Sequence, residues 1–160
     1  MEETHETMKV AGSQLSVERF FRFVLLGYAW LFLAAVVVEV YFAGLMLFDQ
    51  VGGHGLHEDT GWILAWSGVF FLALPGLARA GYPTVVVGVV LALTTFAQPF
   101  LPSVDGSPLI AALHPVNAIL MVVLPILLIR RGTVLVRQER EVGRPSLTDE
   151  RGQSVPVGAD

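Results

Sequence analysis

The sequence predicts an all-α integral membrane protein: a four-helix transmembrane bundle, connected up-down-up-down, with both termini in the cytoplasm. Three observations lead to this prediction. The 160 residues are 54% hydrophobic and only 15% charged, whereas about a quarter of the residues in a soluble domain are charged. The charges are concentrated in the two tails and one loop, with long uncharged stretches between them. Lysine and arginine also flank only one side of the predicted helices.

Four apolar stretches come close to the roughly 20 residues that a membrane-spanning helix needs. The first contains one acid, Glu39. The third begins at Pro83, because proline is favoured in a first helical turn, and it ends before Pro99. The fourth stops at Arg130 and Arg131. The predicted helices cover residues 20–48, 60–78, 83–98 and 109–129.

The remaining segments are polar. Residues 1–18 are predicted to form a cytoplasmic segment, and their polar, acidic character argues against a secretory signal peptide. Residues 132–160 mix charges with proline, glycine and serine, which predicts a disordered cytoplasmic tail. The transmembrane domain is therefore predicted to be residues 19–131.

The orientation follows from the basic residues near the helix ends, because such flanks stay in the cytoplasm. The loops 49–59 and 101–108 hold no lysine or arginine and are predicted to lie outside. The basic residues assigned to the inner side are Lys9, Arg19, Arg22, Arg79, Arg130, Arg131, Arg137, Arg140 and Arg144.

Several classes of protein do not fit. No basic domain or basic-aromatic surface suggests nucleic acid as a partner, and a chain without cysteine has no disulfide framework or thiolate metal site. The dipeptide His57-Glu58 resembles the start of a metalloprotease HExxH motif, but Gly61 replaces the second histidine. We expect no enzyme activity from the chain on its own, and we expect its main partner to be the lipid bilayer.

Polar side chains collect in the outer half of the predicted bundle, where they are costly in lipid unless they face an interior or a cavity. His57 and His114 lie at similar heights near the starts of two helices, and Gln98 reaches the same level from below. Asn117 lies one turn deeper, and Glu39 lies about 13 Å below Phe48 at 1.5 Å per residue. The inner half has almost no such residues, so we predict a one-sided pocket.

Two imidazoles on different helices at one height can supply both axial ligands of a haem within a four-helix bundle. We therefore predict a single haem b bound by His57 and His114, with the small residue Gly61 leaving room for the macrocycle. Such a site would serve electron transfer with a quinone or a periplasmic redox partner.

Other interpretations stay open. His54, His57 and His114 could form a copper or zinc site, since nitrogen and oxygen ligands suit these metals. Glu39 and the histidines could instead form a proton path or a quinone pocket. The plainest alternative is a structural or partner-binding subunit without a cofactor.

Three stretches are similar to a known family: residues 40–48 (VYFAGLMLF), 57–62 (HEDTGW) and 113–120 (LHPVNAIL). They resemble a family of small four-helix prokaryotic membrane proteins classified only as a domain of unknown function. The resemblance implies the fold and a location in the plasma membrane of a prokaryote. It draws attention to His57, Gly61, His114, Pro115 and Asn117, which match the family's pattern, whereas Glu39 stands where the family is expected to have glutamine. The layout is more distantly similar to membrane b-type cytochromes and haem A synthase.

Overall fold

The computed structural model describes residues 2–48, 52–103 and 107–142 of the chain. In these residues all regular secondary structure is helical and no strand is formed. Four helical stretches are long and apolar enough to cross a membrane, as the sequence predicted. They cover Val17–Leu47, Gly53–Leu77, Tyr82–Ser103 and Pro108–Glu139.

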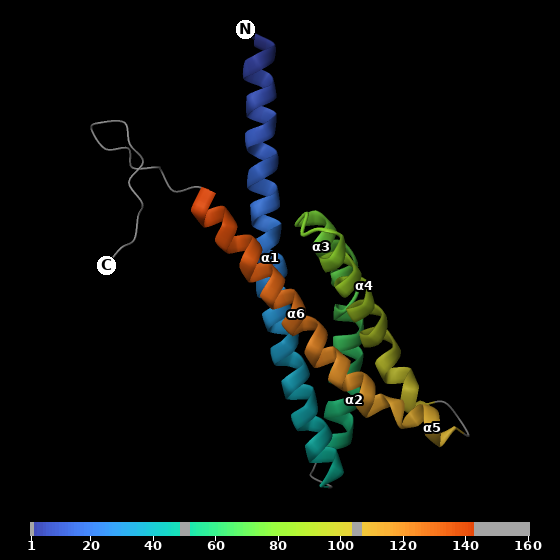
Figure 1. The fold of residues 1–160 in the computed structure, drawn as a ribbon. Helices are drawn as coiled ribbons and strands as arrows, with labels where there is room; N and C mark the ends of the chain where they lie inside the picture. The colour runs from blue at the N-terminus through green and yellow to red at the C-terminus, as the bar shows by residue number, and fades with distance from the viewer. Residues whose placement is uncertain (1, 49–51, 104–106, 143–160) are drawn as a thin grey trace, which may run out of the picture.

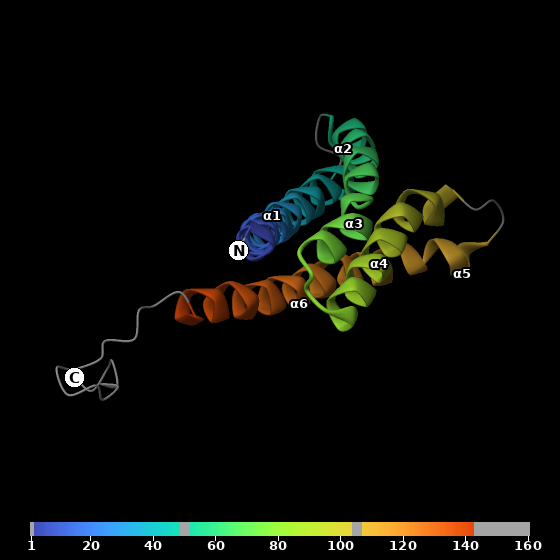
Figure 2. The same ribbon diagram turned by 90° about the horizontal axis from the view of Figure 1, so that it is seen from above.

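Successive stretches run in opposite directions, so that the chain passes four times along the bundle (Figure 1). The elements in chain order are α1 (Glu2–Leu47), α2 (Gly53–Ser67), α3 (Phe70–Leu77), α4 (Tyr82–Ala97), the 3₁₀ helix η1 (Gln98–Ser103), α5 (Pro108–Ala111) and α6 (Leu113–Val142). Helix α1 packs against α2, α3 and α6, and α4 packs against α3 and α6 (Figure 2).

The core forms where one stripe of each helix turns inward. On α1 this stripe consists of Leu25, Ala29, Phe32 and Val36, which are all buried and follow the three-to-four residue spacing of one helix face. On α4 the residues Thr84, Gly88, Leu91 and Thr95 are buried, and they follow the same three-to-four residue spacing. The opposite faces carry large apolar side chains such as Leu31 and Ile63, which are two-thirds exposed.

Two glycines allow the second and third stretches to approach closely. A Cβ atom on Gly68 would lie 2.9 Å from the Thr95 side chain, and one on Gly88 would lie 2.6 Å from the Phe71 carbonyl oxygen. Small residues at such crossings let helix backbones pack against each other in lipid, where van der Waals contact replaces the hydrophobic effect between helices.

One end of the bundle is tied together by charges. Arg22 of α1 pairs with Glu139 of α6, and its Nε donates a hydrogen bond of 3.2 Å to the Ala78 carbonyl oxygen. Arg79, in the turn between α3 and α4, places Nη1 2.6 Å from Oε1 of Glu18 on α1. These contacts join three of the four helical stretches, and the end that carries them is called the arginine end below.

The helices extend further than the sequence predicted. Helix α1 begins at Glu2 instead of residue 20, α2 begins at Gly53 instead of residue 60, and α6 ends at Val142 instead of residue 129. The prediction of a disordered tail from residue 132 is therefore wrong for residues 132–142, while residues 143–160 lie outside the described part of the chain. Hydropathy indicates only the apolar part of each helix, because hydrogen bonding within a helix does not stop where the sequence becomes polar.

Candidate functional site

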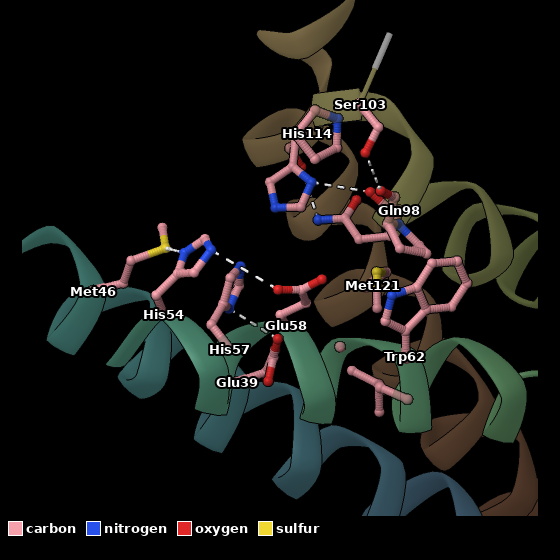
Figure 3. A pocket seen from close by; sticks show the side chains of 14 residues that line it. Glu39, Met46, His54, His57, Glu58, Trp62, Gln98, Ser103, His114 and Met121 are labelled. Carbon is pink, nitrogen blue, oxygen red and sulfur yellow. Dashed lines mark hydrogen bonds and ion pairs between the residues drawn. The ribbon is translucent and has the colours of Figure 1, made fainter. Parts of the chain in front are cut away.

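At the end of the bundle opposite the arginine end, polar side chains from α1, α2, η1 and α6 meet (Figure 3). Helix α1 contributes Glu39, α2 contributes His57, η1 contributes Gln98, and α6 contributes His114 and Asn117. The structure thus brings together the five polar residues that the sequence placed in the outer half of the predicted bundle. We call this group the histidine cluster.

The two imidazole rings of the cluster lie next to each other in a nearly perpendicular arrangement. Their centroids are 6.0 Å apart, and the ring planes are inclined at 79°. Figure 3 shows that one nitrogen of each ring points toward the other ring, while the second nitrogen points to an oxygen. Nδ1 of His57 lies 2.9 Å from Oε1 of Glu39, and Nδ1 of His114 lies 3.0 Å from the Gln98 carbonyl oxygen.

These contacts set the chemistry of both rings. A carbonyl oxygen can only accept a hydrogen bond, so Nδ1 of His114 carries a proton and donates a hydrogen bond to the Gln98 carbonyl oxygen. The same protonation of His57 suits the carboxylate of Glu39, although the 2.9 Å contact is too bent for a standard hydrogen bond. In a neutral imidazole this leaves Nε2 of each ring with a free lone pair. Both rings therefore present a ligand nitrogen to the space between them.

The carboxylate of Glu39 contacts Thr60 as well as His57. Its Oε2 accepts a hydrogen bond from the Thr60 hydroxyl, while Oε1 contacts His57. The hydroxyl of Thr60 also lies 2.5 Å from the carbonyl oxygen of Leu56 in the preceding turn of α2. A Cβ atom on Gly61 would stand 3.1 Å from Oε1 of Glu39. Glycine at this position therefore leaves the carboxylate room beside α2.

Gln98 and Asn117 connect the end of α4 to the start of α6. Nε2 of Gln98 donates to the His114 carbonyl oxygen at 3.0 Å, and Nδ2 of Asn117 contacts Oε1 of Gln98 at 2.6 Å. The same Nδ2 lies 2.7 Å from the Thr94 carbonyl oxygen near the end of α4. Asn117 is not among the described residues that line the two cavities beside the cluster, and its amide is linked to His114 through the Gln98 side chain.

Two cavities, of about 460 Å³ and 360 Å³, lie beside the pair of histidines. The larger one extends past Trp62 and Pro99, and the smaller one extends past Val40 and Ala118. The histidine pair stands in the wall between them. The residues lining both cavities are Glu39, His57, Leu64, Gln98, His114 and Met121.

His54 does not join the pair. It lies in the first turn of α2 instead of a loop, its side chain is 81% exposed, and its ring contacts Met46 Sδ at 3.3 Å and Glu58 Oε2 at 3.8 Å. Among the residues with described side chains, no three His, Asp or Glu residues are grouped so that they could hold a metal ion. The copper or zinc shell of His54, His57 and His114 is therefore not assembled.

Sequence reasoning missed two parts of the cluster. Thr60 was placed at the start of a predicted helix, yet it lies one turn after His57 and holds Glu39. The backbone carbonyl of Gln98 is the acceptor for His114, and a sequence shows no backbone acceptors. The spacing of His57 and Thr60, three residues apart on one helix face, was the one signal available.

No protein-family model, curated protein or solved structure matches this chain significantly. The resemblance to a family of four-helix prokaryotic membrane proteins therefore stays a prediction. What the histidine cluster can do follows from its geometry.

Proposed function

We propose that this chain is a multi-pass protein of a prokaryotic plasma membrane, with both termini in the cytoplasm, that binds one haem b between His57 and His114. Two independent sets of observations support the two parts of this proposal.

Membrane insertion is supported by the outer surface of the bundle. Each of the four apolar stretches exposes large aliphatic side chains, such as Leu31, Ile63, Leu93 and Ile119, all more than 60% exposed. Contiguous apolar surface of this extent is unfavourable in water and suits lipid. The orientation rests on the basic residues, because Arg22, Arg79, Arg130 and Arg131 flank the arginine end, which is then the cytoplasmic end.

Haem binding is supported above all by the protonation pattern of the histidine pair. Metal-bound histidines usually donate the remaining N–H to a carboxylate or a backbone carbonyl, which fixes the tautomer and ring orientation. His57 faces a carboxylate and His114 donates to a carbonyl. At about 2.0 Å per imidazole–metal bond, as for zinc, two imidazoles that hold one ion would have ring centroids roughly 5–6 Å apart, depending on the angle between the two bonds. The separation here is 6.0 Å.

The surroundings also fit a flat, largely apolar group. The cavities flanking the pair provide space on two sides, and their shared wall includes Leu64 and Met121. No lysine or arginine is among the described residues that line either cavity, so propionates would be solvated by water. When bound, a haem b would supply one-electron redox chemistry, which suits exchange of electrons with a membrane quinone or a periplasmic partner.

The first test is an absorption spectrum of the full chain, expressed with adequate haem and purified in detergent, before and after reduction. We expect a Soret band and sharp reduced bands in the wild type. His57→Ala and His114→Ala should lose them, because each removes one of the two imidazoles that would hold the haem. His54→Ala is the matched control, since this exposed histidine of the same helix lies outside the pair, and it should keep the full spectrum.

A colourless wild-type protein with intact helical circular dichroism would refute haem binding. Equal loss of colour in all three variants would also refute it, because the effect would then not be specific to the pair. A structural or partner-binding role would be favoured in either case.

The orientation can be tested because the chain contains no cysteine. Single cysteines at Asp59→Cys and Gln138→Cys occupy exposed positions on opposite ends of the bundle. In intact cells a membrane-impermeant maleimide should label the cysteine at position 59, and the one at position 138 only after lysis. The reverse pattern would place both termini outside.

A further inference from the structure

A third cavity lies at the arginine end, between the start of α4 and the second half of α6. Its volume is about 430 Å³. Leu127, Val134 and Leu135 give it aliphatic walls, while Arg130 and Arg131 bring two guanidinium groups. It shares no lining residue with the cavities of the histidine cluster, so it is a separate place in the fold.

Four of the arginines near this end form two contrasting pairs. Arg22 and Arg79 are held in ion pairs with Glu139 and Glu18. Among residues with described side chains, no carboxylate forms an ion pair with Arg130 or Arg131, and both arginines are exposed. The two charges beside the cavity are thus not neutralised by this part of the protein, in contrast to the two charges that join the helices.

The depth of this cavity matches a lipid headgroup region. Arg130 follows His114 by 16 residues on α6, or about 24 Å along a helix. The hydrocarbon core of a bilayer is about 30 Å thick. With the histidine cluster near the outer boundary, the guanidinium groups come close to the inner boundary, where phosphate groups of lipids lie.

We infer that this cavity binds the headgroup of an anionic phospholipid from the cytoplasmic leaflet. The guanidinium groups of Arg130 and Arg131 would contact the phosphate, since arginine matches phosphate oxygens with two parallel hydrogen bonds. Leu127, on the membrane side of the arginines, would contact the start of an acyl chain. Basic pockets between transmembrane helices on the cytoplasmic side bind anionic headgroups in this way. The inference depends on the proposed membrane insertion and orientation and is independent of haem.

The test uses thermal unfolding of the detergent-purified full chain with added phosphatidylglycerol, phosphatidylcholine or inorganic phosphate. A ligand that binds the folded state raises the unfolding temperature in a saturable manner. We expect this response to phosphatidylglycerol alone. The variant Arg130→Gln/Arg131→Gln should need about thirtyfold more of this lipid, if each arginine contributes as a basic residue near an anionic surface does.

Two further variants separate the cavity from general charge. Arg137→Gln removes an exposed arginine of the same helix that does not line the cavity, and it should respond like the wild type. Ala80→Leu keeps both arginines but places a larger side chain in the cavity, and it should weaken the response. Saturable stabilisation that is unchanged in the double variant, equally weakened in Arg137→Gln, or reproduced by phosphate alone would overturn the inference. So would a wild type that does not respond.

Discussion

Glu39 provides the sharpest test of how the histidine cluster is built. Its two carboxylate oxygens have different partners, the Thr60 hydroxyl and Nδ1 of His57. Glutamine can serve both, because its amide oxygen can accept from Nδ1–H and its NH₂ group can donate to the hydroxyl oxygen. Leucine has a similar size and can serve neither. Glu39→Gln and Glu39→Leu therefore separate hydrogen bonding from packing.

The magnitudes follow from burial. The side chain of Glu39 is 13% exposed and that of His57 is 20% exposed. Nδ1–H of His57, whose contact with Oε1 of Glu39 is already bent, would therefore lose its only oxygen partner among the described residues at a place with little access to water. Leaving a buried donor unsatisfied costs about 1–3 kcal/mol. We expect Glu39→Leu to lower the free energy of unfolding by about this amount, and Glu39→Gln to change it by less than about 1 kcal/mol, since it keeps the contacts and removes a desolvated charge.

The assay is unfolding in mixed micelles of detergent and dodecyl sulfate, followed by circular dichroism. If haem is bound, its affinity gives a second measurement, because loss of the partner that orients a metal-bound histidine typically weakens metal binding 10- to 100-fold. Glu39→Leu should show this loss and Glu39→Gln should not. Equal effects of the two substitutions on both measurements would contradict the assigned role of Glu39.

Two further predictions concern the helix packing. Gly88→Ala places a methyl group 2.6 Å from the Phe71 carbonyl oxygen, whereas Gly76→Ala meets nothing within 4 Å. We expect the first to destabilise by about 1–3 kcal/mol and the second to stabilise slightly through helix propensity, both measured by the same unfolding assay; equal effects would contradict the close approach of α3 and α4. Arg79 has a φ angle of +45°, which strains a residue with a side chain by roughly 1–2 kcal/mol. Its side chain is 64% exposed, so its ion pair contributes little to stability. Glycine adopts a positive φ angle without strain and alanine does not, so Arg79→Gly should be more stable than Arg79→Ala by about 1 kcal/mol. The opposite order would show that Arg79 is not strained.

Much of the fold could be predicted from the sequence because a chain that spans a membrane would follow a simple rule. An apolar run in hydrocarbon has to be a helix, since its backbone must satisfy its own hydrogen bonds, and the run predicted for residues 83–98 agrees with α4 to within one residue. The polar helical segments before residue 60 and after residue 129 follow no such rule. Hydropathy does not detect these segments, in which residues four apart on the helix, such as His54 and Glu58, contact each other.

Most residues of the candidate site could be predicted from the sequence, but the orientation of their side chains could not. Height along each helix brought His57, His114 and Gln98 to one level, because helices rise by a fixed amount per residue. Which nitrogen of each ring faces an oxygen depends on side-chain rotation and on backbone carbonyls, and neither leaves a periodic signal. The contacts of Asn117 show this, since its amide binds the Thr94 carbonyl oxygen and the Gln98 side chain, neither of which the spacing of polar residues indicates.

The two histidines are held by different kinds of support, and this difference determines how perturbations should spread. His114 is fixed by hydrogen bonds between η1 and α6, both to its ring and to its own carbonyl. His57 has one polar anchor, Glu39 on α1. Changes in the packing of α1 against α2 should therefore act on His57 and leave His114 in place. The arginine end, which joins α1 to α6 and to the turn before α4, restrains α1 far from the cluster.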